Sequence, residues 1–327
     1  MAAEVTLLDA ARRGDEAAFE QLVEPHRAEL HAHCYRMLAS LPDAEDALQE
    51  ALLGAWRGLP RFEGRSSLRS WLYTVATNAC LKLVERRPKL VLPIDYGPAA
   101  DPHDGLGEPV HEPLWVEPYP DAGLAYEQRE SVELAFIAAL QHLPARQRAV
   151  LILSEVLGFS GAEVADALET TPASVYSALQ RAHKTVDERL PRQSQQATLR
   201  ALGDERLREL VGEYVAAWER GDVSAVAALL TEDVTLAMPP RPEWYAGLEA
   251  VTAFLRVTPL HAPGRWRVVA VSANGQPALA EYLRDDEHDG FKAHGINVLT
   301  LDGGRVSEVM AFLDPALFAR FGLPDRV

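Results

Sequence analysis

Residues 64–87, GRSSLRSWLYTVATNACLKLVERR, combine positive charge with aromatic rings in a pattern suited to binding a nucleic acid strand. Trp71 and Tyr73 stand among basic residues, and residues 51–89 hold eight Lys or Arg against two acids. Aromatic rings stack on unpaired bases, and Lys or Arg side chains bind phosphates. In a chain whose formal net charge is -16, this local excess of positive charge predicts a nucleic-acid-binding face. Taken alone, the segment leaves a second interpretation open, in which both rings pack in a core and the arginines solvate a helix end.

A second group of reactive side chains places four candidate metal ligands within nine residues: His26, His31, His33 and Cys34. His31 and His33 are two residues apart on an expected helix, so they face different directions. We therefore expect a structural helix here, with neither a metal ion nor a cofactor.

The composition bounds the class of protein. With 327 residues, of which 48% are hydrophobic, the chain is long enough for two or three domains with buried cores. Its negative charge argues against nonspecific binding of nucleic acid by the whole molecule. Cys34 and Cys80 are the only cysteines, which excludes a disulfide framework and fits a reducing compartment. Residues 1–19 contain no apolar signal core, and no run of eighteen apolar residues occurs, so we expect a cytoplasmic protein with no membrane partner.

Residues 5–89 read as helices. Apolar residues recur at helical spacing in DAEDALQEALLGAWRGL, and Asp43 is the expected N-cap of that helix. The basic and aromatic residues fall on the next helix, which Ser66 or Ser67 would cap. One helix and the loop before it therefore carry most of the local positive charge.

Residues 124–190 are helical again and contain a helix-turn-helix pattern. A short helix at about residues 160–168 and a second one that begins near Pro172 flank the turn residues ETTP. This arrangement is typical of proteins that place the second helix in the major groove of DNA.

Two segments read as linkers. Residues 90–123 are rich in Pro and Gly, and from residue 91 onward they hold seven acids and no Lys or Arg. A free linker has no need of the residues LWVEPYPD, so we expect four side chains to dock on another part of the chain: Leu114, Trp115, Val116 and Tyr119. Residues 191–204 form a second, polar linker.

Residues 205–327 read as a separate α+β domain. A helical stretch is followed by alternating segments that predict antiparallel strands, and LDGGRV is the expected hairpin turn between the last two.

Three stretches resemble the extracytoplasmic-function (ECF) class of bacterial RNA polymerase sigma factors in their order and spacing. They are DAEDALQEALLGAW, FEGRSSLRSWLYTVATNACLKLVERR and LPARQRAVLILSEVLGFSGAEVADALETTPASVYSALQRAHKTV, and the resemblance covers about residues 7–190. Residues 205–320 resemble the SnoaL-like polyketide-cyclase superfamily, a curved sheet around a cone-shaped cavity. A subgroup of these sigma factors carries such a domain at the C-terminus, after a linker with a similar Trp- and Pro-containing motif.

The resemblance implies a multidomain fold: two all-α sigma domains, the second a helix-turn-helix, and a C-terminal α+β SnoaL-like domain with a curved antiparallel sheet. The implied boundaries are 5–89 for sigma region 2, 90–123 for the acidic linker, 124–190 for sigma region 4, 191–204 for the second linker and 205–327 for the regulatory domain.

The resemblance also implies a role without a catalytic step. The protein would bind core RNA polymerase through the beta-prime clamp helices and the beta flap, and would direct initiation at specific promoters. Four residues are implied in binding to the clamp helices: Asp46, Leu48, Gln49 and Glu50. An acidic helix suits a basic partner surface.

For the minus-10 promoter element, the resemblance implies that residues 62–67 form a loop that captures a base flipped from the melted strand. The following helix would hold that strand through amide, aromatic and phosphate contacts. The implied contacts are Phe62, Arg65, Ser66, Tyr73, Asn78, Lys82, Arg86 and Arg87.

For the minus-35 element, residues 171–186 would be the recognition helix in the major groove. The expected contacts are Ser174, Tyr176, Ser177, Gln180, Arg181 and Lys184. The sequence departs from the family where Tyr176 and Ala178 replace residues that are commonly basic. Residues 124–190 hold six Lys or Arg against nine acids, so this domain should bind DNA weakly without polymerase.

The C-terminal domain is expected to modulate the sigma domains in cis, through docking of Trp115 and Tyr119. Four residues are expected to line its cavity: Tyr214, Trp218, Tyr282 and His294. Asn297 is a further candidate, and Glu281 is a candidate acid. No catalytic pair stands at a recognisable spacing, so a small-molecule ligand is a more economical occupant than a substrate.

Two other classes stay open. A ligand-responsive helix-turn-helix regulator would explain residues 124–327 but leaves the acidic helix and the basic helix before them without a role. A SnoaL-like enzyme would use the helical half as a dimerisation arm and would show turnover.

Overall fold

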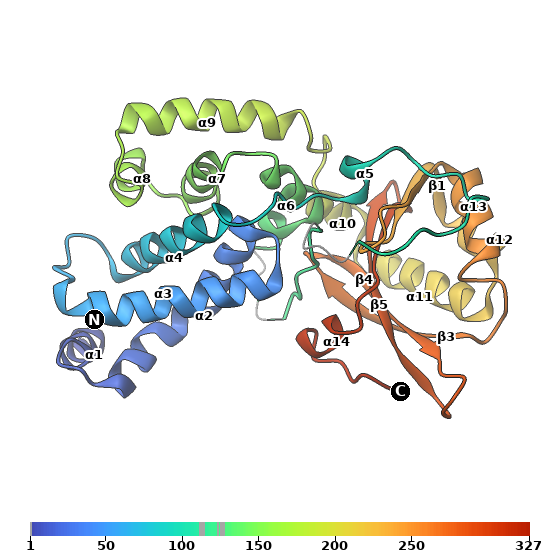
Figure 1. Ribbon diagram of the computed structural model, residues 1–327, viewed down its shortest axis with the longest axis horizontal. Coiled ribbons are helices and arrows are strands. Elements are labelled where there is room, and N and C mark those ends of the chain that lie inside the picture. Colours follow the sequence, from blue (N-terminus) through green and yellow to red (C-terminus); the bar gives the residue numbers. More distant parts are fainter. Residues whose placement is uncertain (1, 111–114, 123, 125–127) are drawn as a thin grey trace. The chain divides into compact units, whose positions relative to one another are not determined.

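The computed structural model describes residues 2–110, 115–122, 124 and 128–327 (Figure 1). The chain forms two compact units. Of the described residues, the helical unit comprises 2–89, 124 and 135–190, and the sheet unit comprises 90–110, 115–122, 128–134 and 191–327. The segment between the two sigma-like regions therefore belongs to the sheet unit for most of its length.

The first part of the helical unit is a set of mutually packed helices (Figure 1). They are α1 (Ala2–Arg12), α2 (Glu16–Leu38), α3 (Leu41–Gly58) and α4 (Leu68–Val84), with a 3-10 turn η1 (Leu59–Arg61) after α3. Small side chains at the contacts allow close approach: Ala44, Ala47, Ala51 and Ala55 of α3 are all buried.

The starts of these helices follow from capping side chains. Ser67 caps α4 by accepting from the backbone N of Ser70 at 3.0 Å, which confirms one of the two predicted caps. The prediction that Asp43 caps α3 is wrong. Ser40 is the N-cap, and its side chain accepts a hydrogen bond from Asp43 N at 3.4 Å. A cap needs an extended backbone, which Ser40 has, whereas Pro42 and Asp43 already lie in the first turn of the helix.

The second part of the helical unit holds the helix-turn-helix. Its elements are α6 (Leu134–Gln141), α7 (Ala145–Leu151), a π-helical turn η4 (Ile152–Val156), α8 (Gly161–Ala167) and α9 (Pro172–Asp187). Ser160 and Glu163 form a capping box at the start of α8, and Thr171 caps α9 by accepting from Ser174 N. The predicted pair of helices is thus confirmed, with Pro172 at the first position of the second helix.

The sheet unit contains six strands in the order β2-β1-β6-β5-β4-β3. Their bounds are β1 (Leu230–Ala237), β2 (Trp244–Ala246), β3 (Trp266–Ala273), β4 (Gln276–Arg284), β5 (Phe291–Asp302) and β6 (Arg305–Phe312). The hairpin turn between β5 and β6 lies at Gly303 and Gly304, as the LDGGRV pattern predicted. The sheet is mixed and not wholly antiparallel, because β1 runs parallel to β6 while every other neighbouring pair is antiparallel.

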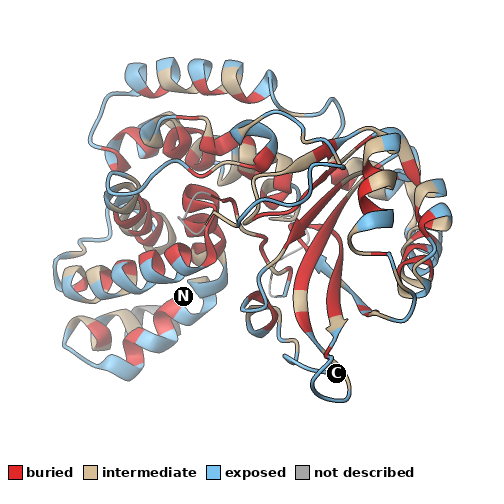
Figure 2. Ribbon diagram, turned by 45° about the vertical axis from the view of Figure 1, so that its right-hand side comes forward, coloured by how far each residue is buried: buried red, intermediate tan, exposed pale blue. Residues whose placement is uncertain are grey.

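Helices cover the curved sheet (Figure 1). They are α10 (Gln195–Leu202), α11 (Asp204–Arg220), α12 (Val223–Ala228), α13 (Leu248–Val257) and α14 (Leu317–Arg320). The segment predicted as a polar linker, residues 191–204, thus contains α10, which Ser194 caps. The main core lies between the sheet and α11, α12 and α13, and the strands that face it are largely buried (Figure 2).

The described residues of the linker pack on the sheet unit. They include the short helix α5 (Pro93–Tyr96) and two isolated bridges, from Val91 to Trp115 and from Pro120 to Ala273. Leu114, which was predicted to dock, lies outside the described residues. No helix among the described residues is both long and apolar enough to cross a membrane.

Candidate functional site

One face of α9 carries every side chain predicted to reach the minus-35 element. These side chains are all exposed: Ser174, Tyr176, Ser177, Gln180, Arg181 and Lys184. The opposite face is buried through Val175, Ala182 and Val186. Because positions three and four residues apart lie on one side of a helix, the exposed set forms a stripe suited to a groove. The ring of Tyr176 belongs to this stripe and is 65% exposed.

The loop before α4 and the end of α4 present most of the predicted minus-10 residues to solvent. The exposed members are Arg65, Ser66, Asn78, Lys82, Arg86 and Arg87. The ring of Phe62 packs on Trp71 with centroids 4.9 Å apart, so the loop starts from an anchored aromatic residue. Arg87 forms an ion pair with the buried Asp43, and Arg65 pairs with Glu63 at 2.5 Å. Lys82 and Arg86 are exposed without such a pair among the residues that the structure describes.

Tyr73 is the exception, because it is fully buried. Its hydroxyl donates to Glu29 Oε2 at 3.1 Å, and its ring lies edge-on to His33 and to Phe159, with centroids 5.1 and 5.7 Å away. Burial and the negative charge of Glu29 raise the pKa of Tyr73. In this conformation Tyr73 offers no ring to a base, and the prediction that it stacks on DNA is not met. The periodicity alone could have placed it inside, since Tyr73 is one turn before the buried Ala76 and Thr77.

Glu29 gathers a polar network beneath the basic segment. Arg69 donates to it from Nε at 3.0 Å and from Nη2 at 2.9 Å, and His26 Nδ1 lies 2.6 Å from its Oε1. Burial alone would raise the pKa of Glu29, but these hydrogen bonds and the charge of Arg69 outweigh it, so the pKa lies below its usual range. Arg69 is therefore held by Glu29 and is less available than Lys82 or Arg86 to bind a DNA phosphate.

His33 also has a structural role. Its Nε2 lies 2.9 Å from the hydroxyl of Thr77, and burial together with Arg36 lowers its pKa to about 3. The imidazole is therefore neutral at physiological pH and joins α2 to α4.

On α3, the predicted polymerase-binding residues Asp46, Gln49 and Glu50 are exposed. Leu48 is only 7% exposed and packs in the helical core, so it presents little surface to a partner. Leu53, which is not among the predicted contacts, is 49% exposed and lies on the same side as Gln49 and Glu50. Leu53 is four residues after Gln49 and three after Glu50, and this helical spacing could have identified it from the sequence.

A buried arginine joins the two sigma-like regions inside the helical unit. Arg148 of α7 donates to the backbone O of Met37 at the end of α2 and to Gln141 Oε1 at 2.6 Å. It also donates to the backbone O of Leu143 at 3.3 Å, and burial lowers its pKa to about 10. This contact was not predicted, because most of its acceptors are backbone carbonyls, which no sequence motif identifies.

The linker is held at a hairpin turn of the sheet unit, which we call the anchor turn: Asn274 and Gly275, between β3 and β4. Tyr119 N donates to Asn274 Oδ1, and Asn274 N donates to Tyr119 O, both at 2.8 Å. Gly275 N donates to Asp121 Oδ1 at 2.8 Å, and Asn274 Nδ2 donates to the backbone O of Val132 at 2.7 Å. Both turn residues have positive φ, which is why Asn and Gly occur here.

A second attachment involves Glu133 and the start of α10. The carboxylate of Glu133 accepts from the backbone N of Gln195 at 3.0 Å and of Gln196 at 2.7 Å, where the helix dipole favours negative charge. The side chain of Gln195 then exchanges two hydrogen bonds with the backbone of Leu301, at 3.0 and 2.8 Å. Burial raises the pKa of Glu133 although both backbone donors oppose it.

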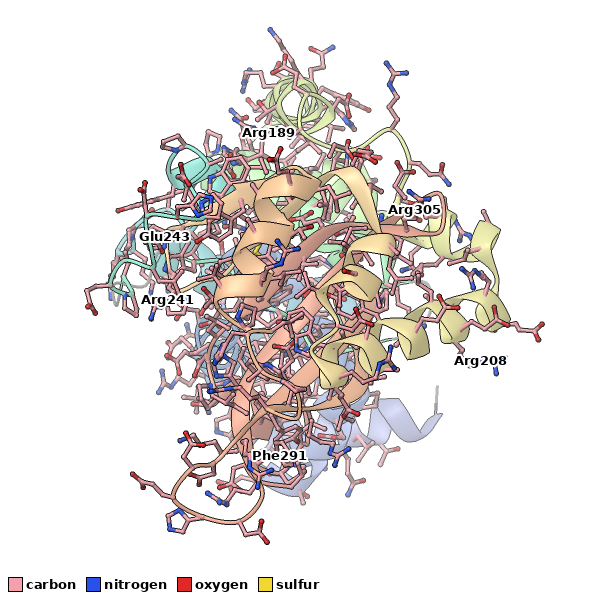
Figure 3. All side chains as sticks on the ribbon, turned by 90° about the vertical axis from the view of Figure 1, so that its right-hand side faces the viewer. Arg189, Arg208, Arg241, Glu243, Phe291 and Arg305 are labelled. Atoms are coloured by element: carbon pink, nitrogen blue, oxygen red, sulfur yellow. The ribbon has the colours of Figure 1, made fainter. Side chains whose placement is uncertain are left out.

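A third attachment holds the linker near residue 107. Gly107 N donates to Glu243 Oε1 at 2.7 Å, and the guanidinium of Arg241 donates to Gly107 O. Val110 N donates to Pro240 O at 2.9 Å. Figure 3 shows Arg241 and Glu243 on the same side of the sheet unit, beside the linker.

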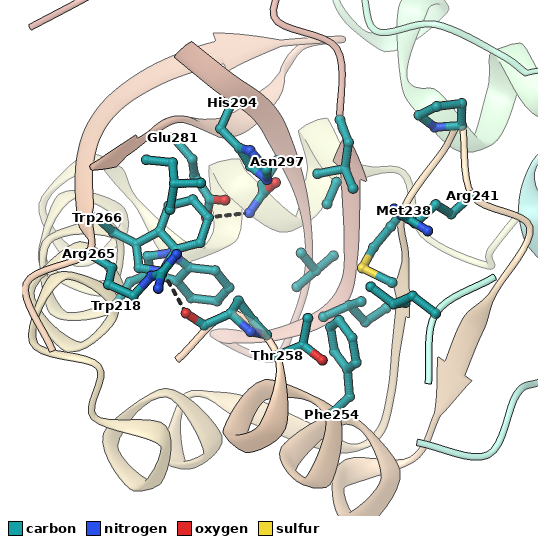
Figure 4. A pocket seen from close by; sticks show the side chains of 18 of the residues that line it. Trp218, Met238, Arg241, Phe254, Thr258, Arg265, Trp266, Glu281, His294 and Asn297 are labelled. Carbon is teal, nitrogen blue, oxygen red and sulfur yellow. Dashed lines mark hydrogen bonds between the residues drawn. The ribbon is translucent and has the colours of Figure 1, made fainter. Parts of the chain in front are cut away.

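The sheet unit encloses a cavity of about 390 Å³ (Figure 4). Apolar and aromatic side chains dominate its wall, and side chains with polar atoms on it include Trp218, Arg241, Arg265, Glu281, His294 and Asn297. Two linker residues, Leu106 and Pro109, complete the wall.

Two of the four predicted cavity residues line the cavity, and two do not. Trp218 and His294 line the cavity. Tyr214 is buried and stacks on Trp218 with centroids 5.7 Å apart, and Tyr282 donates its hydroxyl to Pro324 O at 3.1 Å on the other face of the sheet. Successive residues of a strand face opposite sides, so Glu281 points into the cavity and Tyr282 away from it.

Glu281 is the most perturbed group of the cavity. It is 2% exposed, and Asn297 Nδ2 donates to its Oε1 at 2.6 Å. Burial raises the pKa of Glu281 to about 8, with the Asn297 hydrogen bond opposing it. Burial also lowers the pKa of His294. Glu281 and His294 are therefore both mainly uncharged at physiological pH, and the formal charge on the cavity wall is that of Arg241 and Arg265.

Comparison with protein families finds three matches. Residues 22–89 match the model of Sigma-70 region 2, residues 133–186 match Sigma-70 region 4, and residues 211–309 match the SnoaL-like domain.

Individual relatives agree with these matches. The chain is 45% identical over 326 residues to the ECF RNA polymerase sigma factor SigG of Mycobacterium tuberculosis, an alignment that covers 97% of this chain and 86% of the relative. It is 26% identical over 320 residues to SigJ of the same organism, covering 93% and 94% of the two chains. The crystal structure of SigJ superposes with a TM-score of 0.59 and 25% identity, over 95% of this chain and all of that one.

Proposed function

Because the chain belongs to the ECF family of RNA polymerase sigma factors, with sigma-70 regions 2 and 4 and a C-terminal SnoaL-like domain, we propose that its sheet unit controls initiation by holding the linker between the two sigma regions. As a sigma factor, the protein binds core RNA polymerase and promoter DNA and is not an enzyme. A helix-turn-helix regulator that acts without polymerase does not account for the region 2 match.

We assign the polymerase contact to the exposed face of α3. Asp46, Gln49 and Glu50 supply polar groups there for the beta-prime clamp helices, and Leu53 replaces Leu48 as the apolar contact. Region 4 would contact the beta flap. A mostly acidic face favours a basic partner surface and speeds its association.

We assign the minus-10 contact to residues 62–67 and the end of α4, where Asn78, Lys82 and Arg86 are exposed. We assign the minus-35 contact to the exposed face of α9. The two elements are about 25 base pairs apart, which is roughly 85 Å of B-DNA at about 3.4 Å per base pair.

The two regions are in contact in the helical unit, through Tyr73 with Phe159 and through Arg148 with Met37. Regions that touch cannot reach elements this far apart, so both can bind one promoter only after they separate. Simultaneous binding matters because the second contact then occurs at a high effective concentration.

The linker sets how far the regions can separate. Residues 90–122 connect region 2 to region 4, and much of that length is bound to the sheet unit. While it is bound, the free chain between the regions is short. Release of the linker would lengthen it and allow both promoter contacts.

The observation that carries this proposal is the pair of hydrogen bonds between Tyr119 and the anchor turn. They join the linker to residues more than 150 positions away in the sequence, at a buried site. Both hydrogen bonds break together when the linker leaves the anchor turn. The bound and released linker are therefore two distinct conformational states.

The test is reconstituted transcription from a pool of genomic promoter fragments, with bacterial core polymerase and the full chain. Promoter-specific transcripts that require the protein are expected. Variants that weaken the linker attachment should raise transcript yield at limiting protein. The same yield from wild type and from every attachment variant would contradict regulation through the linker, while an absence of specific transcripts would contradict the promoter assignments.

A further inference from the structure

The loop assigned to the minus-10 strand, residues 62–67, is held at its two ends and exposed between them. At its start, Phe62 N donates to Leu59 O at 3.1 Å, and at its end Ser67 accepts from the backbone N of Ser70 at 3.0 Å. Residues 63–66 are all exposed. The position of this short exposed segment therefore depends on how firmly Phe62 and Ser67 are held.

Phe62 is also held from outside the α3–α4 connection, by Arg12 at the end of α1. The Nη2 atom of Arg12 donates to the backbone O of Phe62. The Cζ atom of Arg12 lies 5.9 Å from the centroid of the Phe62 ring, within the range of a cation–π interaction. Because 50 positions separate the two residues in the sequence, this contact joins different elements and is not a local helix cap.

The ring of Phe62 has a second support in Trp71 of α4, whose ring centroid lies 4.9 Å away. Trp71 in turn lies against Gly58 at the end of α3, where an added Cβ atom would come within 3.2 Å of the indole ring. The missing side chain of Gly58 therefore leaves room for Trp71. Residues of α1, α3 and α4 thus jointly fix the position of Phe62.

Arg12 itself stands on a well-defined turn between α1 and α2. Gly14 N donates to Ala11 O at 3.0 Å, and the side chain of Asp15 caps α2. α1 also packs on η1, the turn that leads into the loop (Figure 1). Asp9 Oδ1 lies 3.5 Å from Arg12 Nη1, and this partly exposed ion pair adds little stability but helps to orient the guanidinium group.

Capture of a base from a melted strand benefits from a loop that is already ordered. Flipping the base costs stacking free energy, and fixing a mobile loop costs conformational entropy. A loop that is in place before the strand arrives avoids the second cost. The side chain of Arg12 is 30% exposed, and its guanidinium group is engaged by Phe62 and Asp9, so it is suited to holding the loop and not to binding a phosphate.

From these contacts we propose that Arg12 is a positioning residue for promoter melting, which holds Phe62 so that residues 62–67 are preformed to capture a base of the minus-10 strand. This inference rests on the proposed function, in which these residues meet that strand. It adds α1, which carries none of the assigned DNA contacts, to the elements that determine how tightly the strand is held. Arg12 acts through Phe62 and not by direct contact with DNA.

A thermodynamic cycle between Arg12 and the captured base tests the proposal. Wild-type holoenzyme, formed from the full chain and core polymerase, first selects a single-stranded oligonucleotide from a pool of random sequences. An abasic site is then placed at each position of the selected sequence in turn. The position where the abasic site weakens wild-type binding most marks the captured base, and we expect a loss of about tenfold there, because stacking and pocket contacts are removed.

Arg12→Ala should weaken binding of the intact oligonucleotide about fivefold, which corresponds to the loss of one hydrogen bond. The abasic site should then weaken binding of this variant only about twofold, because both changes act on the same pocket. Arg12→Lys keeps the charge and a donor, and should restore most of the affinity. Arg13→Ala is the matched control and should bind as wild type does, because Arg13 is exposed and no described contact joins it to residues 62–67.

A tenfold effect of the abasic site in both wild type and Arg12→Ala would overturn the positioning role, because a general loss of stability leaves this factor unchanged. Equal losses in Arg12→Ala and Arg13→Ala would attribute the effect to net charge and would also overturn it. Arg12→Gln, which keeps a donor without the charge, takes the place of Arg12→Ala if that variant does not fold. If no abasic site weakens wild-type binding, the assignment of residues 62–67 to base capture is wrong, and the role of Arg12 fails with it.

Discussion

Tyr119 and Asn274 exchange two hydrogen bonds of 2.8 Å each, one from each backbone N, and they join the linker to the β3–β4 turn. The side chain of Asn274 also donates to Val132 O at 2.7 Å, so a single residue holds the chain on both sides of the residues that lead into region 4. Asn274 is therefore the residue on which the proposed control of initiation by the linker depends most.

Asn274→Gly is the most selective way to weaken the attachment. Glycine keeps the positive φ of 56° without strain and removes both side-chain hydrogen bonds. Each bond is worth about 1 kcal/mol, so the bound state of the linker should lose on the order of 2 kcal/mol. We expect a several-fold rise in promoter-specific transcripts at limiting protein, measured with core polymerase. Asp104→Ala, an exposed change in the same linker, is the control, and equal yields from both variants would argue against the attachment.

The buried Glu281 predicts a specific dependence of stability on pH. Its carboxyl group ionises near pH 4.5 in the unfolded chain and near pH 8 in the folded protein. Between these values the folded protein keeps a proton that the unfolded chain has lost, so the free energy of unfolding falls as pH rises. The total fall attributable to this group is on the order of 5 kcal/mol.

Glu281→Gln removes this titration and keeps an oxygen for Asn297 Nδ2. Relative to wild type, the variant should gain stability between pH 5 and pH 8, as measured by urea unfolding of the full chain at both values. Glu232→Gln, at an exposed position, is the control for the chemical change. A stability difference between Glu281→Gln and wild type that does not change with pH would contradict the assignment.

Two substitutions in the recognition helix α9 should impair promoter binding in different ways. Arg181→Ala should cost about 1–3 kcal/mol at the preferred promoter and relax the choice of base, because arginine reads base edges. Lys184→Ala should weaken binding to all sequences and lower the salt dependence by about one unit of slope, because it meets a phosphate. Binding of the holoenzyme to a promoter library at several salt concentrations separates the two. Arg208→Ala makes the same charge change on the exposed surface of α11, and a comparable loss there would mean that net charge alone is responsible.

The acidic face of α3 predicts a loss of polymerase binding on charge reversal. Glu50→Arg should reduce the affinity for core polymerase about tenfold, mainly through slower association, because it opposes a basic partner. Leu53→Asp should reduce the affinity by a similar factor through faster dissociation. Fluorescence anisotropy with labelled protein measures both. Glu20→Arg on α2 is a matched control at an exposed position, and identical behaviour of all three variants would move the interface elsewhere.

Local chemistry made the helices predictable. Ser67 and Thr171 cap α4 and α9 with their own side chains, and Pro172 fits the first turn, so a few adjacent residues decide where each helix begins. The misplaced start of α3 has the same origin. Ser40 and Asp43 are both good caps, and only the backbone conformation of Ser40 distinguishes them.

Long-range pairing was not predictable. The parallel alignment of β1 with β6 joins segments separated by the rest of the sheet, so no local pattern encodes it. The attachments of Asn274, Gln195 and Arg148 likewise join residues far apart in sequence, often through backbone atoms, which carry no residue-specific signal. Tyr73 and Leu48 were assigned to surfaces from the resemblance, although burial on their helices places both inside.

Hydrogen exchange of the linker would show directly whether the linker leaves the anchor turn during initiation. Amide exchange of residues 115–122 and of the anchor turn would be compared between the free full chain and the same chain in a complex with core polymerase and promoter DNA. We expect strong protection of Asn274 N, which is bonded to Tyr119 O, in the free protein, and loss of that protection in the promoter complex. Equal protection in both states would contradict release of the linker during initiation.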